Sequence, residues 1–132
     1  MHNKSLGILI LRLSVSILLL LHGINKVIHG TGGIENMLAE KGLPEFIAWG
    51  VYLGEVIAPL LVIIGFRTRI FTLIMFVNML VIMLVFKTDL LFSFAQTGAW
   101  ELELQGLYLF GSLALFFTGA GKYAVSTGSK WD

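Results

Sequence analysis

The chain has 132 residues, of which 57% are hydrophobic and 13% are charged, and its mean hydropathy is +0.89. This composition excludes an ordinary soluble globular protein, and a formal net charge of +1 without a basic run gives no indication of nucleic-acid binding. The absence of cysteine excludes disulfides, an internal thiol relay and thiolate-held iron–sulfur or zinc centres. We therefore expect an integral membrane protein whose redox chemistry, if any, is supplied by a partner or a bound ligand.

Four apolar segments predict four transmembrane helices that form one all-α membrane domain over residues 1–132. A helix of about 20 apolar residues crosses a hydrocarbon core of about 30 Å. The first segment is longer than the apolar region of a signal peptide and has no small-residue cleavage site after it, so we expect a retained helix. The predicted helices cover about residues 6–28, 46–65, 70–86 and 102–118.

The connection between the first two predicted helices has a helical pattern of its own. Glycines open it, Ile34, Met37 and Leu38 follow at helical spacing, and the sequence GLP ends it. We therefore expect a short helix at the membrane interface. The third connection, residues 87–101, mixes aromatic and polar side chains and is typical of a loop in the headgroup region.

The distribution of basic residues predicts the orientation in the membrane. Five of them fall at the two ends of the chain and in the second connection, whereas the opposite side carries three lysines among six acids. Because cytoplasmic segments are enriched in lysine and arginine, we expect both termini to be cytoplasmic. The five basic residues are Lys4, Arg67, Arg69, Lys122 and Lys130.

The first predicted helix carries a polar stripe. At about 100° per residue, one face collects Arg12, Ser16, Gly23 and Lys26, and His22 lies beside it. A charge exposed to lipid at mid-membrane costs several kcal/mol. The stripe is therefore expected to face the bundle interior or a wet cavity, where its charges need partners.

Glu55 is the expected partner of Arg12, because it is the only acid deep inside a predicted span. Tyr52 and Pro59 share its helix face. Pro59 has no N–H and leaves the backbone carbonyl of Glu55 without its helical partner, so this position offers a carboxylate and a free carbonyl. Asn78 of the third helix can add a polar contact.

Small residues on an adjoining face of the second helix predict close helix packing. Gly50, Gly54 and Ala58 form a row of small residues four apart, which lets another helix approach and enclose Glu55. We expect this row, together with Pro59, to be the packing surface of the second helix.

Several of these polar residues also have a structural explanation. His22 lies near the interface, where a histidine costs little, and its functional alternative is a pH-sensitive role. We interpret Lys26 as an interfacial charge that extends to the headgroups, and the pair Glu101 and Glu103 allows the same interpretation. Three further side chains can simply hold helices together, namely Asn78, Ser16 and Tyr52.

Cofactor motifs are largely absent from the sequence. Membrane haem b usually takes two histidines from facing helices, and only His22 lies within a predicted span. We expect no metal site and no intrinsic cofactor. A quinone is compatible with the sequence, because it needs only an apolar, aromatic-rich cleft and one or two hydrogen-bonding groups, which Arg12, His22 or Glu55 can supply.

An ordered set of motifs makes the chain resemble the DoxX family. The motifs are LRL with Arg12, LHGINK with His22 and Lys26, KGLP, GEVIAPLLVIIGFRTR with Glu55, and GAGKY near Gly119, and they extend over nearly the whole chain. The resemblance implies a four-helix protein of the bacterial-type plasma (inner) membrane.

The resemblance also has implications for function and for the site. The family takes its name from a subunit of a thiosulfate:quinone oxidoreductase, and other members are associated with membrane oxidoreductase complexes. This chain departs from the family pattern at its end, where GKYAVSTGSKWD replaces the usual serine–leucine–aspartate, and it lacks the cysteines of some members. The family pattern marks Arg12, His22, Lys26, Glu55 and an acid at the start of the fourth helix, here Glu101 or Glu103.

Two classes of function follow, with a third beside them. In the first, the protein is an inner-membrane, non-catalytic subunit of a quinone-linked oxidoreductase, in which Arg12 and Glu55 bind the quinone and His22 exchanges protons. In the second, it carries or binds a small solute or a proton, with Glu101, Lys26 and His22 at the outer mouth. The third is a structural assembly subunit. The first depends on a redox partner and the second on an oligomer, so we expect a homo-oligomer or a hetero-oligomeric membrane complex.

Overall fold

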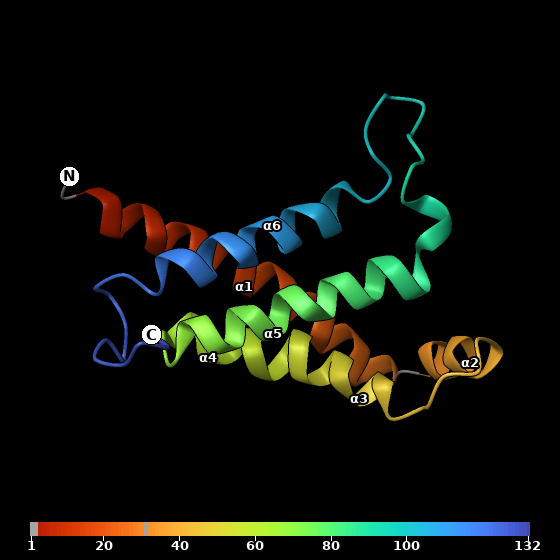
Figure 1. Cartoon of the computed structure of the whole chain (residues 1–132), viewed down its shortest axis with the longest axis horizontal. Coiled ribbons are helices and arrows are strands. Elements are labelled where there is room, and N and C mark those ends of the chain that lie inside the picture. Colours follow the sequence, from red (N-terminus) through yellow and green to blue (C-terminus); the bar gives the residue numbers. More distant parts are fainter. Residues whose placement is uncertain (1–2, 31) are drawn as a thin grey trace.

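The computed structural model describes residues 3–30 and 32–132 (Figure 1). These residues are helical apart from turns, loops and an isolated β-bridge between Phe94 and Trp100. The all-α prediction is therefore confirmed. The helices are α1 (Asn3–His29), α2 (Gly32–Glu40), α3 (Ile47–Tyr52), η1 (Leu53–Ile57), α4 (Ala58–Ile64), α5 (Thr68–Val81), η2 (Ile82–Phe86), η3 (Thr88–Leu90) and α6 (Glu103–Thr118).

Within residues 3–30 and 32–132, three stretches of helix are long and apolar enough to cross a membrane. They are α1, the continuous helix α3–η1–α4 and the continuous helix α5–η2, and their bounds agree with the first three predicted spans. α6 follows the fourth predicted segment and has 16 residues. The protein is thus a multi-pass membrane protein by the length and composition of its helices.

The long helices pack along one another, and both ends of the chain lie at the same end of the bundle (Figure 1). α2 and the loop from η3 to α6 lie at the opposite end (Figure 1). α1 contacts α3, η1, α4 and α6, while α5 contacts α4 and α6. α1 runs antiparallel to α3–η1–α4, because Gly23 abuts Glu55 whereas Gly65 lies beside the guanidinium of Arg12.

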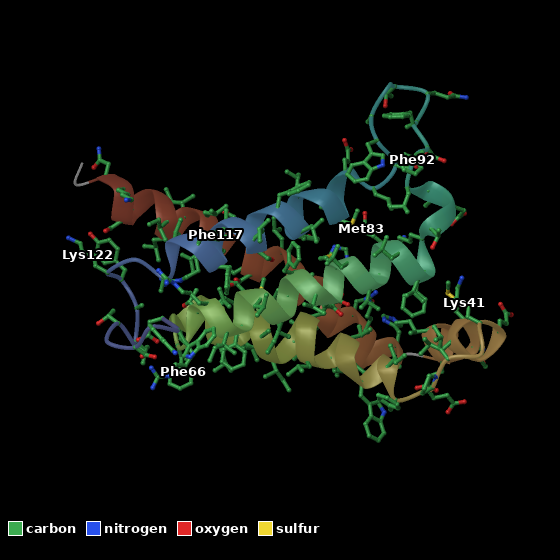
Figure 2. All side chains as sticks on the ribbon, viewed as in Figure 1. Lys41, Phe66, Met83, Phe92, Phe117 and Lys122 are labelled. Atoms are coloured by element: carbon green, nitrogen blue, oxygen red, sulfur yellow. The ribbon has the colours of Figure 1, made fainter. Side chains whose placement is uncertain are left out.

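Apolar side chains cover the outside of the bundle as well as its interior. The core contains fully buried residues of α1, α4, α5 and α6, among them Leu19, Val62, Met75 and Leu115. Side chains project outward along the whole length of the bundle (Figure 2). Leu107 and Phe117 on α6 are each 70% exposed. An apolar outer surface of this extent requires lipid around it.

The predicted helix between the first two spans is present as α2. It ends in a Schellman motif, in which Gly42 has a φ of 71° and the Leu43 N–H donates to the Leu38 carbonyl at 2.8 Å. The Leu38 side chain is fully buried. The short helix is therefore held by one apolar anchor and by a glycine-dependent end.

A π-helical turn, η1, ends two residues before Pro59 in the second long helix. Proline offers no N–H to the Glu55 carbonyl, and the Ala58 N–H donates to the Leu53 carbonyl, one residue further back than in an α-helix. The widened turn places the Glu55 backbone against α1 at Gly23. The sequence predicted that the Glu55 carbonyl loses its helical hydrogen-bond donor, and at this position the helix changes from α to π hydrogen bonding.

Candidate functional site

An ion pair between α1 and η1 forms the centre of the candidate site. The Lys26 ammonium donates to both carboxylate oxygens of Glu55, at 2.8 Å to Oε1 and 2.7 Å to Oε2. Asn78 of α5 donates from Nδ2 to Oε2 at 3.4 Å. Glu55 is 1% exposed, whereas 27% of the Lys26 side chain is exposed. The carboxylate is thus enclosed and paired, and the ammonium is its contact with the surroundings.

Close backbone approaches hold this pair in position. A side chain at Gly23 would overlap the backbone carbonyl of Glu55, and a Cβ at Gly54 would lie 2.5 Å from the Asn78 side chain. The Tyr52 hydroxyl donates to the backbone carbonyl of Lys26 at 3.4 Å. Because Gly23 and Gly54 have no side chain, α1 and α5 can both pack closely against η1 at Glu55.

A cavity of about 280 Å³ lies beside the ion pair. This volume is at the small end of the range for ligand sites, about 300–1,000 Å³. One wall contains the rings of His22 and Tyr108, which meet edge to face with centroids 5.7 Å apart. Leu19, Met79 and Ile82 supply apolar walls. The polar residues that line the cavity are His22, Lys26, Glu55, Lys87, Gln105 and Tyr108.

Three polar residues of this cavity were not among the residues that the sequence pointed to, namely Lys87, Gln105 and Tyr108. Tyr108 is a polar-tipped residue within an otherwise apolar helix, and it is 6% exposed. A tyrosine within a mostly apolar helix could have pointed to this site, because a buried tyrosine hydroxyl usually has a hydrogen-bonding partner. Lys87 directly follows η2, so only the fold shows that it belongs with the others.

The acids at the start of the fourth helix do not line the cavity. Glu103 is the first residue of α6 and is exposed. Glu101 is also exposed, and its backbone N–H donates to the Ser93 carbonyl at 3.0 Å. Glu101 thus lies outside the cavity that Lys26 and His22 line, and its place at an outer mouth stays a prediction.

The expected ion pair between Arg12 and Glu55 is wrong. Fourteen residues separate Arg12 from Lys26 on the same helix, which corresponds to about 21 Å along its axis. In the antiparallel register, Gly23 lies at the level of Glu55 and Arg12 lies near Gly65. Lys26, which we interpreted as an interfacial charge, takes the place assigned to Arg12 as the partner of Glu55.

Arg12 instead binds backbone carbonyls at the other end of the bundle. Its Nη1 donates to Ala120 O at 2.6 Å, and its Nη2 donates to Tyr123 O at 2.7 Å and to Ile63 O at 3.3 Å. α4 and α6 end beside these acceptors, where partial negative charge accumulates on unpaired carbonyls. Arg12 is 2% exposed and thus acts as a buried clamp between two helix ends and the C-terminal segment, defined here as residues 119–132.

The small-residue row contributes to packing at two of its three positions. Ala58 is fully buried, as is its neighbour Pro59, and Gly54 contacts Asn78. Gly50 is exposed, and a Cβ there would meet no atom within 4 Å. Gly50 instead lines an apolar groove of about 450 Å³ between α3 and α5, so its predicted helix contact is wrong.

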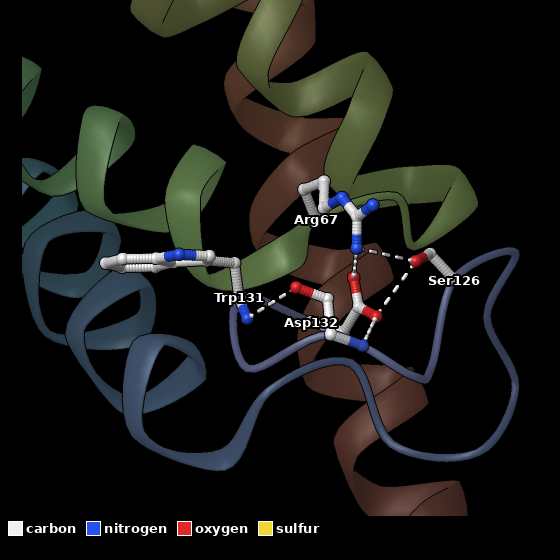
Figure 3. A network of polar contacts seen from close by, with 5 residues as sticks. Arg67, Ser126, Trp131 and Asp132 are labelled. Atoms are coloured by element: carbon white, nitrogen blue, oxygen red, sulfur yellow. Dashed lines mark hydrogen bonds and ion pairs between the residues drawn. The ribbon is translucent and has the colours of Figure 1, made fainter.

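A second polar cluster forms where the C-terminal segment meets the α4–α5 turn (Figure 3). The Asp132 carboxylate accepts from the Ser129 N–H at 2.6 Å, from the Ser126 hydroxyl at 2.8 Å and from Arg67 Nη1 at 3.4 Å. Burial raises the pKa of Asp132, but these hydrogen bonds and the Arg67 charge outweigh burial and lower the pKa below its ordinary value of 3.8. Asp132 therefore fastens the segment in its ionised form.

We expect the stability that Asp132 supplies to be lost in acid. Because its pKa is lowered in the folded protein, the contribution is fully present above the unfolded value of 3.8 and disappears as pH falls through the lower folded value. Thermal unfolding of the wild type and of Asp132→Asn in detergent, measured at several pH values, should differ at neutral pH and converge in acid. A constant difference at every pH would contradict this assignment.

The model of the family described as DoxX matches residues 7–88. The chain belongs to the DoxX family. No curated protein and no solved structure matches the chain. The family resemblance found in the sequence is therefore confirmed.

The DoxX match covers one part of the candidate site and leaves another outside. It includes α1 from Gly7 onward and the helices up to Lys87, and thus the Lys26–Glu55 pair and the Asn78 contact. α6, with Tyr108, and the whole C-terminal segment lie beyond the matched residues. The ion pair of this DoxX protein is thus within the family region, whereas one wall of its cavity comes from outside it.

Proposed function

We propose that this DoxX protein is a membrane subunit of an oxidoreductase system, non-catalytic by itself, whose cavity beside Glu55 binds a quinone headgroup or a similar small ligand. The observation that carries the proposal is the ion pair between the buried Glu55 and the partly exposed Lys26, on the wall of a cavity within a membrane bundle. Desolvation commonly offsets the attraction within a buried ion pair, so stability alone does not account for it. A binding role does.

Each polar group on the cavity wall has its own part in this proposal. The Lys26 ammonium and the Tyr108 hydroxyl donate hydrogen bonds to a ligand carbonyl. The Glu55 carboxylate accepts a hydrogen bond from the reduced, hydroxyl-bearing ligand. His22 is exposed on one side and lines the cavity on the other, so it exchanges protons with the surroundings. A partner protein supplies the two electrons that accompany two protons in quinone reduction.

We propose the following placement in the membrane. α6 crosses as a fourth span, since it packs along α1 and α5 and exposes Leu107 and Phe117 outward. Both termini face the cytoplasm of a bacterial-type inner membrane, because their end of the bundle carries the basic residues of the α4–α5 turn and of the C-terminal segment. α2 then lies at the opposite interface. The redox partner makes the working unit a hetero-oligomeric complex.

A second candidate function is the transport or binding of a small solute or a proton. The observation that favours it is that three charged residues and a histidine line one cavity, namely Lys26, Glu55, Lys87 and His22. Ionisable groups within a membrane commonly mark proton relays and solute paths. A carrier of this kind depends on a homo-oligomer, because four helices are few for an alternating-access mechanism.

The proposed quinone site is tested by photolabelling. Native membranes that contain the tagged protein are irradiated with an azidoquinone, and the labelled peptides are mapped by mass spectrometry. We expect labelling of α1 and α6 peptides, and about tenfold weaker labelling in Tyr108→Phe because one hydrogen bond to the ligand is lost. Tyr123→Phe is the matched control, because Tyr123 is an exposed tyrosine at the other end of the bundle.

Two outcomes would contradict the quinone site. One is labelling that falls equally in Tyr108→Phe and Tyr123→Phe, and the other is the absence of any cavity label in the wild type. Proton flux into liposomes that disappears in Glu55→Gln would then support the carrier function. Retention of a redox protein on the tagged wild type in mild detergent would support the oxidoreductase assignment.

A further inference from the structure

The C-terminal segment forms a fixed surface at the end of the bundle where both chain ends lie (Figure 1). The backbone N–H of Arg69 donates to the backbone carbonyl of Trp131 at 2.8 Å. The backbone N–H of Ala120 donates to Asp132 O, also at 2.8 Å. The Val125 N–H donates to Ile64 O at 3.0 Å. These bonds hold the segment against the start of α5 and the ends of α4 and α6.

Two adjoining cavities lie between this segment and the helices. One, of about 390 Å³, is polar and is lined by hydroxyl side chains, including those of Thr118 and Thr127. The other, of about 350 Å³, is lined by the aromatic rings of Phe116, Phe117 and Trp131. Arg69 and Lys130 line both cavities. One cavity is thus polar, the other is aromatic, and two cationic side chains lie at the boundary between them.

The positive charge at this boundary is not neutralised by the protein. The nearby Asp132 carboxylate is 5% exposed and is occupied by Arg67 and two serine groups (Figure 3). Among the residues that the structure describes, no acid forms an ion pair with Arg69 or Lys130. Arg69 and Lys130 therefore present two unpaired positive charges to the cavities, and the Asp132 carboxylate, which also lines the polar cavity, is paired with Arg67.

Arg69 also has unused hydrogen-bonding capacity. Its buried Nε has no acceptor among the described residues, and its Nη2 makes only a long contact, 3.5 Å, to Phe117 O. The Lys130 ammonium lies over the Trp131 ring at 5.5 Å. A guanidinium left under-bonded beside a lysine is well suited to phosphate oxygens, which accept several charge-assisted hydrogen bonds at once.

We propose that Arg69 and Lys130 bind the phosphate of an anionic phospholipid, whose polar headgroup enters the hydroxyl-lined cavity and whose acyl chains lie along the aromatic cavity. Phe117 is 70% exposed on the outer face of α6, so the aromatic cavity adjoins the surface that faces lipid. Trp131 beside the cations fits the headgroup level of a bilayer, where tryptophan is enriched. Except for Arg69, the cavity residues lie beyond residues 7–88, the region that the family model matches.

The test is native mass spectrometry of the full-length protein in detergent, titrated with short-chain phosphatidylglycerol. Phosphatidylcholine of the same chain length and inorganic phosphate are titrated in parallel. We expect phosphatidylglycerol to bind about tenfold tighter than phosphatidylcholine, and Lys130→Gln to weaken it about fivefold, as for one basic residue near an anionic headgroup. Arg69→Gln should weaken it further, because the guanidinium donates to the phosphate directly.

Lys122→Gln is the matched control, because this exposed lysine at the same end lies over the Tyr123 ring and lines neither cavity. An equal loss of affinity in Lys122→Gln and Lys130→Gln would overturn the proposal. Equal binding of phosphatidylglycerol and phosphatidylcholine would also overturn it. Inorganic phosphate that binds as tightly as phosphatidylglycerol would replace the lipid with a free anion. If Arg69→Gln does not fold, Lys130→Gln decides, because Lys130 is an exposed side chain.

Discussion

Gly23→Ala is expected to destabilise the protein by about 3 kcal/mol, at the upper end of the cost of overpacking. The added Cβ would overlap the Glu55 carbonyl oxygen and approach Val56 Cγ2 to 2.8 Å. Backbone atoms cannot rotate away as a flexible side chain can, so α1 must move off η1. Because Lys26 lies less than one turn further along α1, the same shift separates the ammonium from the Glu55 carboxylate.

The measurement is thermal unfolding of the purified protein in detergent, together with photolabelling of the cavity. Gly50→Ala is the matched control, because Gly50 is also a helical glycine but a Cβ there meets no atom within 4 Å. This control should stabilise the helix by up to about 1 kcal/mol, since alanine restricts the unfolded chain more than glycine does. Similar melting temperatures for the two variants would show that α1 and η1 are not in close contact at Gly23.

Arg12→Leu is expected to release the C-terminal segment and to cost about 3 kcal/mol, because it leaves one buried and two partly buried carbonyls without the guanidinium donor. The acceptors are Ile63 O, Ala120 O and Tyr123 O. The cavity at the opposite end of the bundle should keep its ion pair, since Lys26 and Glu55 do not contact Arg12. The variant therefore separates a structural effect from a ligand-binding effect.

Hydrogen exchange in detergent checks this prediction. The amides of Ala120 and Val125 donate to backbone carbonyls in the wild type and should exchange much faster in Arg12→Leu. Lys4→Leu is the control, because it removes an exposed cation from the same helix. Unchanged protection of the two amides in Arg12→Leu would mean that the segment is held without the guanidinium.

The sequence predicted the helices well and their partners poorly, and the reason is physical. Apolar run length and glycine or proline boundaries are local properties, so the first three spans and α2 fall where expected. The burial of Arg12, Ser16 and Gly23 also follows from their shared helix face. The choice between Arg12 and Lys26 as the partner of Glu55 depends on the register of two helices, and a single helix does not determine that register.

The rest of the cavity and the C-terminal segment show the same limit. Tyr108 and Gln105 face the ion pair only because α6 packs beside α1, and the apolar composition of α6 gives little indication of which side faces inward. The C-terminal segment has no apolar periodicity at all. Its position depends on hydrogen bonds to Arg12, to Ile64 and to the start of α5, which are contacts between residues far apart in the chain.

The clamp at Arg12 has a consequence for biosynthesis. Its two shortest hydrogen bonds go to acceptors 108 and 111 residues later in the chain. At a synthesis rate of about 5–20 residues per second, these acceptors emerge about 5–20 s after Arg12. During that interval the guanidinium has to remain hydrated, near the bilayer surface or in a water-filled insertion channel. α1 is therefore synthesised well before the segment whose carbonyls bind the charge of Arg12.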